Sequence, residues 1–521
     1  MDFFNQMKTT ATNNVEYNIK FTENGAVGFD TTGKKLLDLN FTVASLRGAS
    51  NQVIKDKFID AYFENPRLAI LWLFYARDVR EGLGERRLFR VVFPYILESI
   101  ERNTNTTTVS ELINLVSEYG RFDDLFCILE HAPKYTGLVA EVFKKQLETD
   151  LVNMNEGKSI SLLTKWLKSE NASSKESKML ARQTMKMLNM SASEYRKTLS
   201  KLRKYIDVTE IKMSNKEWDK IDYEKVPSKA SLVYKNAFLR NDKDRYEEFI
   251  SQVNKGEKKI NASTLYPHDI VSKYPKHSYW GYSIDKVDES LEALWKNLPN
   301  TLEGKDSANT LVVADGSGSM TCKVGNSNVS ALDVANALAI YFAERATGPY
   351  KNKYITFSNR PQFVDFTHCK TLKDKINMAL KHSEVADTNI EKVFDLILDT
   401  AVLYKLGQDE IVKNIVIISD MEFNSCARSN SGYVTESLFQ TIAKKYEDKG
   451  YKLPRLVFWN VNSRTKTIPI TQNELGVSLV SGFSTNIVKM VLDGETDPYK
   501  ALVKVLESDR YAPINRVLTN N

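Results

Sequence analysis

The segment DGSGSM (315–320) places one carboxylate and two hydroxyls at alternate positions, with glycines between them that let the chain turn tightly. It follows a short apolar run at 310–314, which is typical of a buried strand. Oxygen groups gathered at one strand end suit a hard divalent cation, Mg²⁺ first, with Mn²⁺ or Ca²⁺ as alternatives. Further oxygens would come from a later loop and a later strand end. The predicted cation ligands are Asp315, Ser317, Ser319, Thr388 and Asp420.

Two acidic residues beside these positions leave the use of the site open. Asp387 directly precedes Thr388, and Glu422 follows Asp420 by two residues. Their charge would either help to hold a cation or repel an acidic ligand, and the sequence allows both. A loop that keeps the motif for structural reasons alone, without an ion, is the remaining alternative.

The distribution of positive charge indicates a second kind of chemistry. The chain has 72 Lys and Arg against 66 Asp and Glu, a formal charge of +6, but residues 161–260 alone hold 23 basic and 14 acidic side chains. Positive charge focused in this way attracts polyanions more strongly than the same charge spread evenly. A solvated helical face is the alternative reading of the same charges.

Within this stretch, the residues around 196–204 are predicted to form an amphipathic helix. Tyr195, Leu199, Leu202 and Ile206 fall on one stripe at about 100° per residue, so the cations between them would face outward. Cations arranged along a nucleic-acid backbone give salt-sensitive, sequence-tolerant binding. The candidate RNA contacts on this helix are Arg196, Lys197, Lys201, Arg203 and Lys204.

Other basic side chains lie at helix ends and turns, from which they could reach into an opening between helices. Arginine suits forked contacts with phosphate and stacking on bases. These further candidates are Arg77, Arg80, Arg86, Arg87, Arg121, Lys165, Lys168, Arg182 and Lys186. Internal ion pairs that brace neighbouring helices are an equal alternative for the turn arginines. Arg77 with Asp78 would be one such pair, and Arg121 with Asp123 or Asp124 another.

Catalysis finds little support in the sequence. There is no GxxxxGK[ST] phosphate loop and no HExxH motif, and the five histidines lack the spacing of metal ligands. His368 next to Cys369 has no orienting partner in its pattern. The four cysteines are widely spaced and never form CxxC, which excludes a disulfide framework and a thiolate zinc cluster. We therefore expect a binding protein without catalytic residues, not an enzyme.

The elements that would position these residues change character near residue 300. From about residue 55 to 300, apolar residues recur at helical spacing and short polar or glycine turns separate them, as expected of a bundle or α-solenoid. From residue 306 onward, apolar strands alternate with amphipathic helices, as in a mostly parallel sheet covered on both faces. We expect an extended or hairpin segment at 1–50 that packs on the helical domain, a helical domain at 51–300 and an α/β domain at 306–521.

The DGSGSM motif at its strand end, with Thr388 and Asp420 following in order, resembles the von Willebrand factor A domain and its metal-ion-dependent adhesion site. The helical half resembles the TROVE module of the Ro autoantigen family, and the whole chain looks closest to uncharacterised plant, fungal and viral relatives of that family. This second resemblance rests on FYARDVREGLGERRLFR (74–90), EYGRFDDLF (118–126), SEYRKTLSKLRKYIDVTE (193–210), WDKIDYEKVPSKA (218–230) and LVFWNV (456–461).

These resemblances imply the remaining expectations. The fold would be a HEAT-like, TROVE-like α-helical ring followed by a doubly wound, Rossmann-like von Willebrand A domain. Ser317, Ser319 and Thr388 would bind the ion directly, and Asp315 and Asp420 would act through bound waters. The ring would bind small structured RNA on its surface and single-stranded 3′ ends of misfolded RNA in its hole. A protein partner such as a nuclease would dock at the metal site.

Two functions therefore compete. The first is an RNA-binding, Ro-like ribonucleoprotein with a divalent-metal site for a partner. The alternative is a metal-dependent protein-interaction or assembly module with no RNA role. With 42% hydrophobic and 26% charged residues, the composition is that of a soluble globular protein. The first residues show no signal peptide and no apolar run is long enough to span a membrane, so a cytoplasmic location is expected.

Overall fold

The computed structural model describes residues 18–274, 284, 286–304, 307, 309–325, 327–357, 360–382, 389–424, 438–469, 477–491, 495 and 497–519 of the 521-residue chain. The chain divides into two compact units. The sheet unit takes in Met1–Pro66 and Ala262–Val505, and the helical unit takes in Arg67–Asn261 and Leu506–Asn521.

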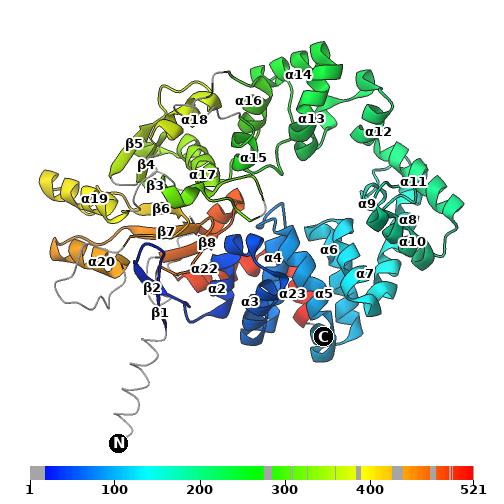
Figure 1. Cartoon of the computed structure of the whole chain (residues 1–521), viewed down its shortest axis with the longest axis horizontal. Coiled ribbons are helices and arrows are strands. Elements are labelled where there is room, and N and C mark those ends of the chain that lie inside the picture. Colours follow the sequence, from blue (N-terminus) through cyan, green and yellow to red (C-terminus); the bar gives the residue numbers. More distant parts are fainter. Residues whose placement is uncertain are drawn as a thin grey trace, which may run out of the picture. The chain divides into compact units, whose positions relative to one another are not determined.

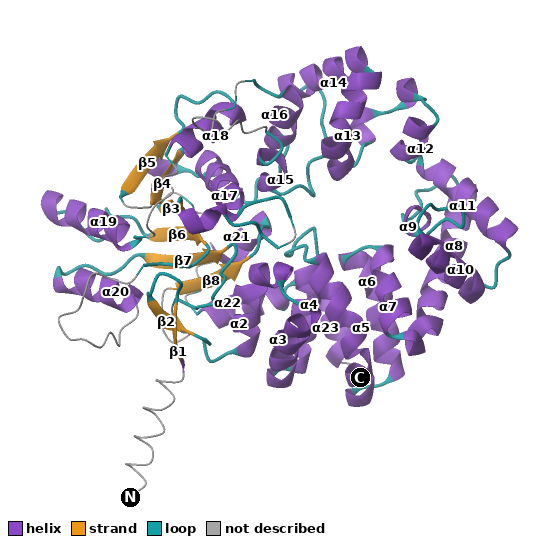
Figure 2. Ribbon diagram, in the orientation of Figure 1, coloured by secondary structure: helices purple, strands orange, loops and turns teal. Residues whose placement is uncertain are grey.

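A six-stranded sheet organises the sheet unit, in the spatial order β5-β4-β3-β6-β7-β8 (Figure 2). Only β5 runs antiparallel to its neighbour, and the other pairs are parallel. The strands are β3 (Thr310–Asp315), β4 (Lys353–Phe357), β5 (Pro361–Asp365), β6 (Asn414–Ser419), β7 (Arg455–Asn460) and β8 (Val477–Ser481). Side chains of β3 and β8 are buried along their whole length, as expected where helices cover both faces of a sheet.

Two neighbouring aromatic residues of β7 show that helices lie on opposite faces. Trp459 meets the ring of Phe342 in α17 edge-on at 5.4 Å, whereas Phe458 meets Phe439 of α20 at 4.5 Å. Because successive side chains of a strand point to opposite faces, α17 and α20 must cover different sides of the sheet. This is the predicted α/β architecture.

The helices of the sheet unit come from both ends of its sequence. They are α2 (Lys35–Thr42), α3 (Asn51–Glu64), α15 (Pro267–Val271), α16 (Glu289–Lys296), α17 (Ala331–Arg345), α18 (Leu372–Lys381), α19 (Glu391–Tyr404), α20 (Leu438–Asp448), α21 (Val488–Val491) and α22 (Pro498–Leu506). A two-stranded antiparallel hairpin, β1 (Ile19–Phe21) and β2 (Val27–Phe29), precedes them. Its turn contains the Glu23-Asn24-Gly25 sequence that predicts a hairpin.

The helical unit contains helices alone among its described elements, and Figure 1 shows α23, from the end of the chain, beside α4 and α5. Its helices are α4 (Pro66–Arg77), α5 (Arg86–Asn103), α6 (Thr106–Tyr119), α7 (Phe126–His131), α8 (Thr136–Asn155), α9 (Leu163–Trp166), α10 (Lys175–Leu188), α11 (Ala192–Ile206), α12 (Thr209–Ser214), α13 (Ser228–Asn241), α14 (Lys243–Lys255) and α23 (Ala512–Thr519). The predicted order of a helical part followed by an α/β part is confirmed.

The division into units differs from the expected segments at both ends of the helical part. Helix α2 belongs to the sheet unit, where Asn460 Nδ2 donates to the Phe41 carbonyl at 2.8 Å. Residues 262–300 also belong there, because Glu292 accepts from the backbone N–H of Leu372 at 2.8 Å and Trp295 Nε1 donates to Glu344 at 2.6 Å. These segments look helical in sequence, but their contacts are with the sheet unit.

The last described residues return to the helical unit. The Tyr511 ring stacks on Tyr119 of α6 at 5.6 Å, and Arg510 pairs with the buried Asp78 at 2.8 Å. The sequence pattern placed 306–521 in one α/β domain and gave no sign of this return. Across the described ranges, no helix is both long and apolar enough to cross a bilayer.

Candidate functional site

Asp315 and Asp420 are brought together by the pairing of β3 with β6. Asp315 is the last residue of β3, and Asp420 directly follows β6, with Ala314 opposite Ile418 in the parallel register. Ligands of such sheets bind at the carboxyl ends of the strands. Both carboxylates are buried, with 0% and 1% of their surface exposed, so two of the predicted ligands lie at neighbouring strand ends.

Asp315 shapes the loop that carries the two hydroxyls. One carboxylate oxygen accepts from the Ser317 backbone N–H at 2.9 Å, and the other accepts from Ser419 Oγ at 2.6 Å. The Ser317 and Ser319 hydroxyls consequently lie together, with their oxygens 3.0 Å apart. Burial raises the pKa of the Asp315 carboxyl above its ordinary value, because removal from water disfavours the charged form.

Asp420 is the less satisfied of the two carboxylates. Its Oδ1 accepts a long hydrogen bond of 3.3 Å from the Glu422 backbone N–H, and its Oδ2 is buried without a hydrogen-bond partner among the described residues. The pKa of Asp420 is raised to about 7, mainly by burial and secondly by the negative charge of Asp315. The two buried carboxylates thus stand at neighbouring strand ends, and nearby positive charge offsets only part of the cost of ionising both.

The guanidinium of Arg464 lies at this cluster and was not predicted. Its Nη1 is 3.6 Å from Asp420 Oδ2 and donates to the Ser319 carbonyl at 3.1 Å. Burial opposes its ionisation, but the charges of Glu23 and Asp420 outweigh that effect and hold the pKa of Arg464 above its ordinary value. Arg464 lies in the loop after β7. Its position after a strand was the only feature of the sequence that could have pointed to it, because ligands bind at strand ends.

Glu422 braces loops. One of its oxygens accepts from the backbone N–H groups of Arg464 and Thr465, both at 2.9 Å, and the other from that of Glu23 at 2.9 Å. It is fully buried. Its hydrogen bonds thus fix the loop after β7 and the turn of the β1–β2 hairpin beside the cluster.

The donor set fits a hard divalent cation. Two carboxylates and two hydroxyls offer oxygen alone, and Asp420 Oδ2 has no hydrogen-bond partner in the described part of the chain. The described residues contain no group of three or more His, Cys, Asp or Glu side chains arranged to hold a metal, so the hydroxyls would have to contribute. Thr388 and Asp387 lie outside the described residues.

Of the predicted RNA contacts at turns, Arg77 is buried and structural. It is 1% exposed and pairs with Asp124 at 2.7 Å, rather than with its neighbour Asp78. Arg121 pairs with Asp123 at 2.6 Å, and its guanidinium lies 3.8 Å from the centre of the Trp166 ring. For these two arginines, the alternative of internal ion pairs describes what the structure contains.

The other predicted turn and helix-end cations are more accessible. Arg86 and Arg87 are exposed at the start of α5, and Arg80 pairs with Glu118 at 3.4 Å. Lys165 is half-buried and 3.6 Å from Glu210, and Lys168 lies over the Phe126 ring. Although part of the Arg86 side chain reaches solvent, the loss of hydration on its packed side, followed by the charges of Arg121, Arg77 and Arg90, lowers its pKa, as expected where guanidiniums crowd.

Helices α10 and α11 carry a concentration of exposed positive charge. Residues 175–204 contain nine Lys and Arg against two Glu. Eight of the cations are exposed: Lys175, Lys178, Arg182, Lys186, Arg196, Lys197, Lys201 and Lys204. Among the described residues, only Arg196 of these eight forms an ion pair within 4 Å, to Glu170 at 3.3 Å. We call these eight side chains the basic face.

Three of the four residues of the predicted apolar stripe anchor α11, whereas Ile206 is half-buried. Tyr195, Leu199 and Leu202 are buried, and the Tyr195 hydroxyl donates to the Lys168 carbonyl at 2.9 Å. Arg203, predicted as an RNA contact, instead donates to the Thr164 and Leu167 carbonyls at 2.8 and 2.6 Å. It therefore satisfies carbonyls around α9.

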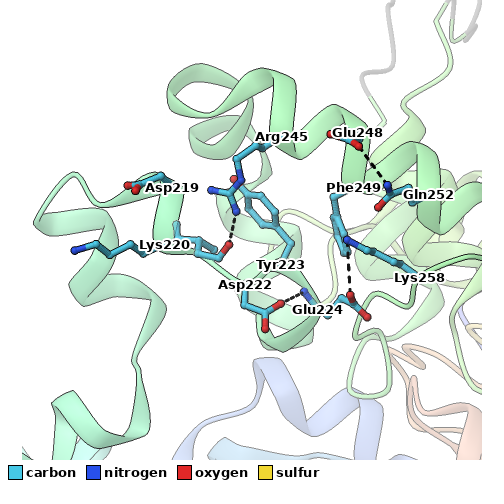
Figure 3. A pocket seen from close by; sticks show the side chains of 11 residues that line it. Asp219, Lys220, Asp222, Tyr223, Glu224, Arg245, Glu248, Phe249, Gln252 and Lys258 are labelled. Atoms are coloured by element: carbon cyan, nitrogen blue, oxygen red, sulfur yellow. Dashed lines mark hydrogen bonds and ion pairs between the residues drawn. The ribbon is translucent and has the colours of Figure 1, made fainter.

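A pocket of about 380 Å³ in the helical unit lies between α14 and the segment before α13 (Figure 3). Its Arg245 spans two backbone carbonyls, of Trp218 at 2.9 Å and Ile221 at 2.7 Å. Lys220 pairs with Glu217, and Lys258 lies 4.0 Å from Glu224. Because its cations already have partners, this pocket offers less to a phosphate than the basic face does.

Comparisons with known proteins identify relatives without an assigned activity. A domain of unknown function, DUF7788, matches residues 309–513, and a second, DUF2828, matches residues 167–307. The uncharacterized protein L728 of Acanthamoeba polyphaga mimivirus is 29% identical over 524 residues, covering 94% of this chain and 87% of its own. The expected likeness to a viral protein is confirmed.

One solved structure resembles this chain weakly. The Ro (RSR) protein of Deinococcus radiodurans matches 90% of this chain and 92% of its own, with 14% identity and a TM-score of 0.38. At that score the likeness decides neither fold nor function. The fold stated above rests on this chain's own elements, and the Ro family resemblance stays a prediction.

Proposed function

We propose that this protein binds RNA through the basic face of α10 and α11 and holds a divalent cation, Mg²⁺ or a similar ion, at Asp315, Ser317, Ser319 and Asp420. The observation that carries the RNA proposal is the set of seven exposed cations on the basic face without an ion pair among the described residues. Cations already paired within the protein gain little from phosphate, whereas unpaired ones release counterions when RNA binds.

The form of the basic face supports a backbone contact rather than base recognition. Lysines outnumber arginines in it six to two, and lysine acts as a mobile point charge on phosphate. The start of α11 is fixed by a reciprocal cap between Ser191 and Glu194. We expect binding to single-stranded RNA with little sequence preference and strong dependence on salt.

The cation would supply a positive centre for an oxygen ligand from a protein partner. Asp315 would orient the loop, Ser317 and Ser319 would offer hydroxyl oxygens, and Asp420 would offer its unpartnered Oδ2. Thr388 remains a proposed ligand from its sequence position alone.

The RNA proposal is tested by neutralising four cations of α11 together, as Arg196→Ala, Lys197→Ala, Lys201→Ala and Lys204→Ala. We expect the affinity for a single-stranded RNA, measured by fluorescence anisotropy at several salt concentrations, to fall at least about tenfold. The slope of log affinity against log salt should decrease by about 2 to 3, because fewer phosphates are neutralised.

A matched control removes four exposed cations of the same unit that are paired within it. Lys220, Lys225, Lys243 and Lys258 pair with Glu217, Asp222, Glu247 and Glu224. The control has the same net charge as the test variant, so equal losses in the two would mean that overall charge, not the basic face, drives binding. Wild-type protein that fails to bind RNA at low salt would exclude the RNA role and leave the interaction module.

A further inference from the structure

The turn of the β1–β2 hairpin places a carboxylate against the cation cluster. Glu23 accepts two hydrogen bonds from Arg464, from Nε at 2.8 Å and Nη2 at 2.5 Å, a bidentate pair. The remaining guanidinium nitrogen, Nη1, faces the cluster and lies 3.6 Å from Asp420 Oδ2. Arg464 therefore bridges the hairpin and the site within the sheet unit.

The hairpin is held in this position by several contacts. Thr22 Oγ1 donates to the Phe423 carbonyl at 2.6 Å, and Asn24 Nδ2 donates to the Glu422 carbonyl at 2.6 Å. Phe29 and Ile468 exchange backbone hydrogen bonds, both of 2.8 Å. The hairpin therefore docks on the loops that follow β6 and β7.

Gly28 allows this approach. A Cβ at this position would lie 2.7 Å from the Ile468 carbonyl oxygen and 2.5 Å from Thr467 Cγ2. Both distances are too short for a real contact, and backbone at 468 cannot move aside as a flexible side chain would. A larger residue at 28 would thus separate the hairpin from the loop that carries Arg464.

The charges around Asp420 imply that Arg464 and a divalent cation compete for this carboxylate. The guanidinium supplies positive charge to Asp420 where a divalent cation would supply it, and two cations at one carboxylate repel each other. Glu23 draws the guanidinium toward the hairpin and neutralises it, which reduces the repulsion. Nothing else among the described contacts of Arg464 carries a full negative charge apart from Asp420 and Glu23.

We infer that Arg464 is a built-in competitor of the divalent cation and that Glu23, by holding Arg464, couples docking of the β1–β2 hairpin to occupancy of the site. This inference rests on the proposed cation site. Binding of the ion favours the docked hairpin, and release of the hairpin frees Arg464 to turn onto Asp420, which weakens ion binding.

The test is calorimetric titration of the full chain with MgCl₂ and MnCl₂. Arg464→Ala should tighten cation binding by about tenfold, because the competing charge is gone. Glu23→Gln should weaken it by about threefold to tenfold, because the guanidinium is no longer neutralised. In the double variant, the Glu23 effect should vanish, since Glu23 acts through Arg464.

Matched variants separate this inference from general damage. Asp30→Asn removes a carboxylate of the same hairpin that pairs with Lys20 at 2.8 Å, and it should leave cation affinity unchanged. Gly28→Ala should weaken cation binding as Glu23→Gln does, because the β1–β2 hairpin could no longer dock beside Arg464. Circular dichroism and melting temperature would show that each variant is folded.

The outcomes are distinguishable. If the wild type binds the cation and Arg464→Ala binds it no more tightly, the inference is wrong but the cation site stands. The same conclusion follows if the effect of Glu23→Gln persists in the double variant. Absence of binding in both the wild type and Arg464→Ala, with Asp420→Ala indistinguishable from them, would overturn the cation site itself and the inference with it.

Discussion

Asp123 and Asp124 hold three arginines of the helical unit in one network. Asp124 accepts from Arg77 Nε at 2.8 Å and from Arg90 Nε at 2.6 Å, and Asp123 pairs with Arg90 and Arg121. Burial opposes ionisation of Asp123, but Arg121 and Arg90 outweigh it and lower its pKa. The network braces the turns around α4, α5 and α6, so its contribution should depend on pH.

Asp123→Asn should lower the free energy of unfolding by about 1–2 kcal/mol at pH 7, allowing for solvent around the half-buried Arg90 and Arg121. Because the folded pKa lies below the unfolded value, near 3.8, this contribution is fully present above about pH 4 and is lost as the pH falls through the folded pKa. The melting temperatures of both proteins should therefore differ by a constant amount from pH 7 to about pH 5 and begin to approach each other between about pH 4 and 3.5.

The control for this pH effect is a surface pair of the same unit. Glu156→Gln breaks an exposed pair with Lys158 and should change stability by less than about 0.5 kcal/mol at any of these pH values. A difference between wild type and Asp123→Asn that stays constant down to pH 3.5 would contradict a role for the Asp123 charge.

At the scale of single residues, the sequence predicted which residues belong to the site better than it predicted which residues they contact. The DGSGSM motif is contiguous, so Asp315, Ser317 and Ser319 were found together, and strand order then placed Asp420. Arg464 stands in no motif and reaches the cluster only through folding of the loop after β7. Arg77 was read as an RNA contact or a partner of Asp78, because its real partner, Asp124, is 47 residues away in the chain.

At the scale of elements, the turn between α4 and α5 depends on a close approach of the backbone. A Cβ on Gly82 would lie 2.0 Å from the Tyr75 carbonyl oxygen, while the N–H of Leu83 donates to that same carbonyl at 3.1 Å. The sequence predicts short polar or glycine turns between helices, and the structure gives the reason for the glycine at position 82. The turn doubles back on the end of α4.

Gly82→Ala should therefore destabilise the helical unit by about 2 kcal/mol or more, because backbone atoms would have to separate. Gly137→Ala is the matched change in α8, where a Cβ meets no atom within 4 Å. Alanine there should be neutral or stabilise by about 0.5–1 kcal/mol through helix propensity. Urea unfolding of both variants checks the contrast, and equal effects would exclude the close approach as the cause.

Two strands of the α/β part match runs seen in the sequence, since apolar runs are local signals. β3 and β7 begin and end within one residue of the segments at 310–314 and 456–461. Which of the two units a helix belongs to is not set by a local signal in its sequence. Helix α16 has the amphipathic pattern of its helical neighbours, but Glu292 and Trp295 find their partners in the sheet unit.

At the scale of the whole molecule, each unit is built from segments far apart in the chain. The helical unit is completed by 506–521, where Arg510 supplies the cation for Asp78, a fully buried carboxylate. Tyr511 adds ring contacts with Tyr75 at 5.9 Å and Tyr119 at 5.6 Å. The chain must therefore return from the sheet unit before the helical unit reaches full stability.

Deleting residues 506–521 should leave Asp78 buried without its arginine and should cost the helical unit about 3 kcal/mol or more. Native-state hydrogen exchange would locate the loss: protection should fall in α4 and α6 and stay unchanged in β3, β6 and β7. Arg510→Met, which keeps an unbranched apolar stem and removes both the charge and the N–H donors to Asp78 and Glu118, should reproduce part of the effect. Unchanged protection in α4 and α6 after the deletion would mean that the N-terminal part of the helical unit is stable without this return, and that Asp78 is satisfied by the Arg80 backbone N–H alone.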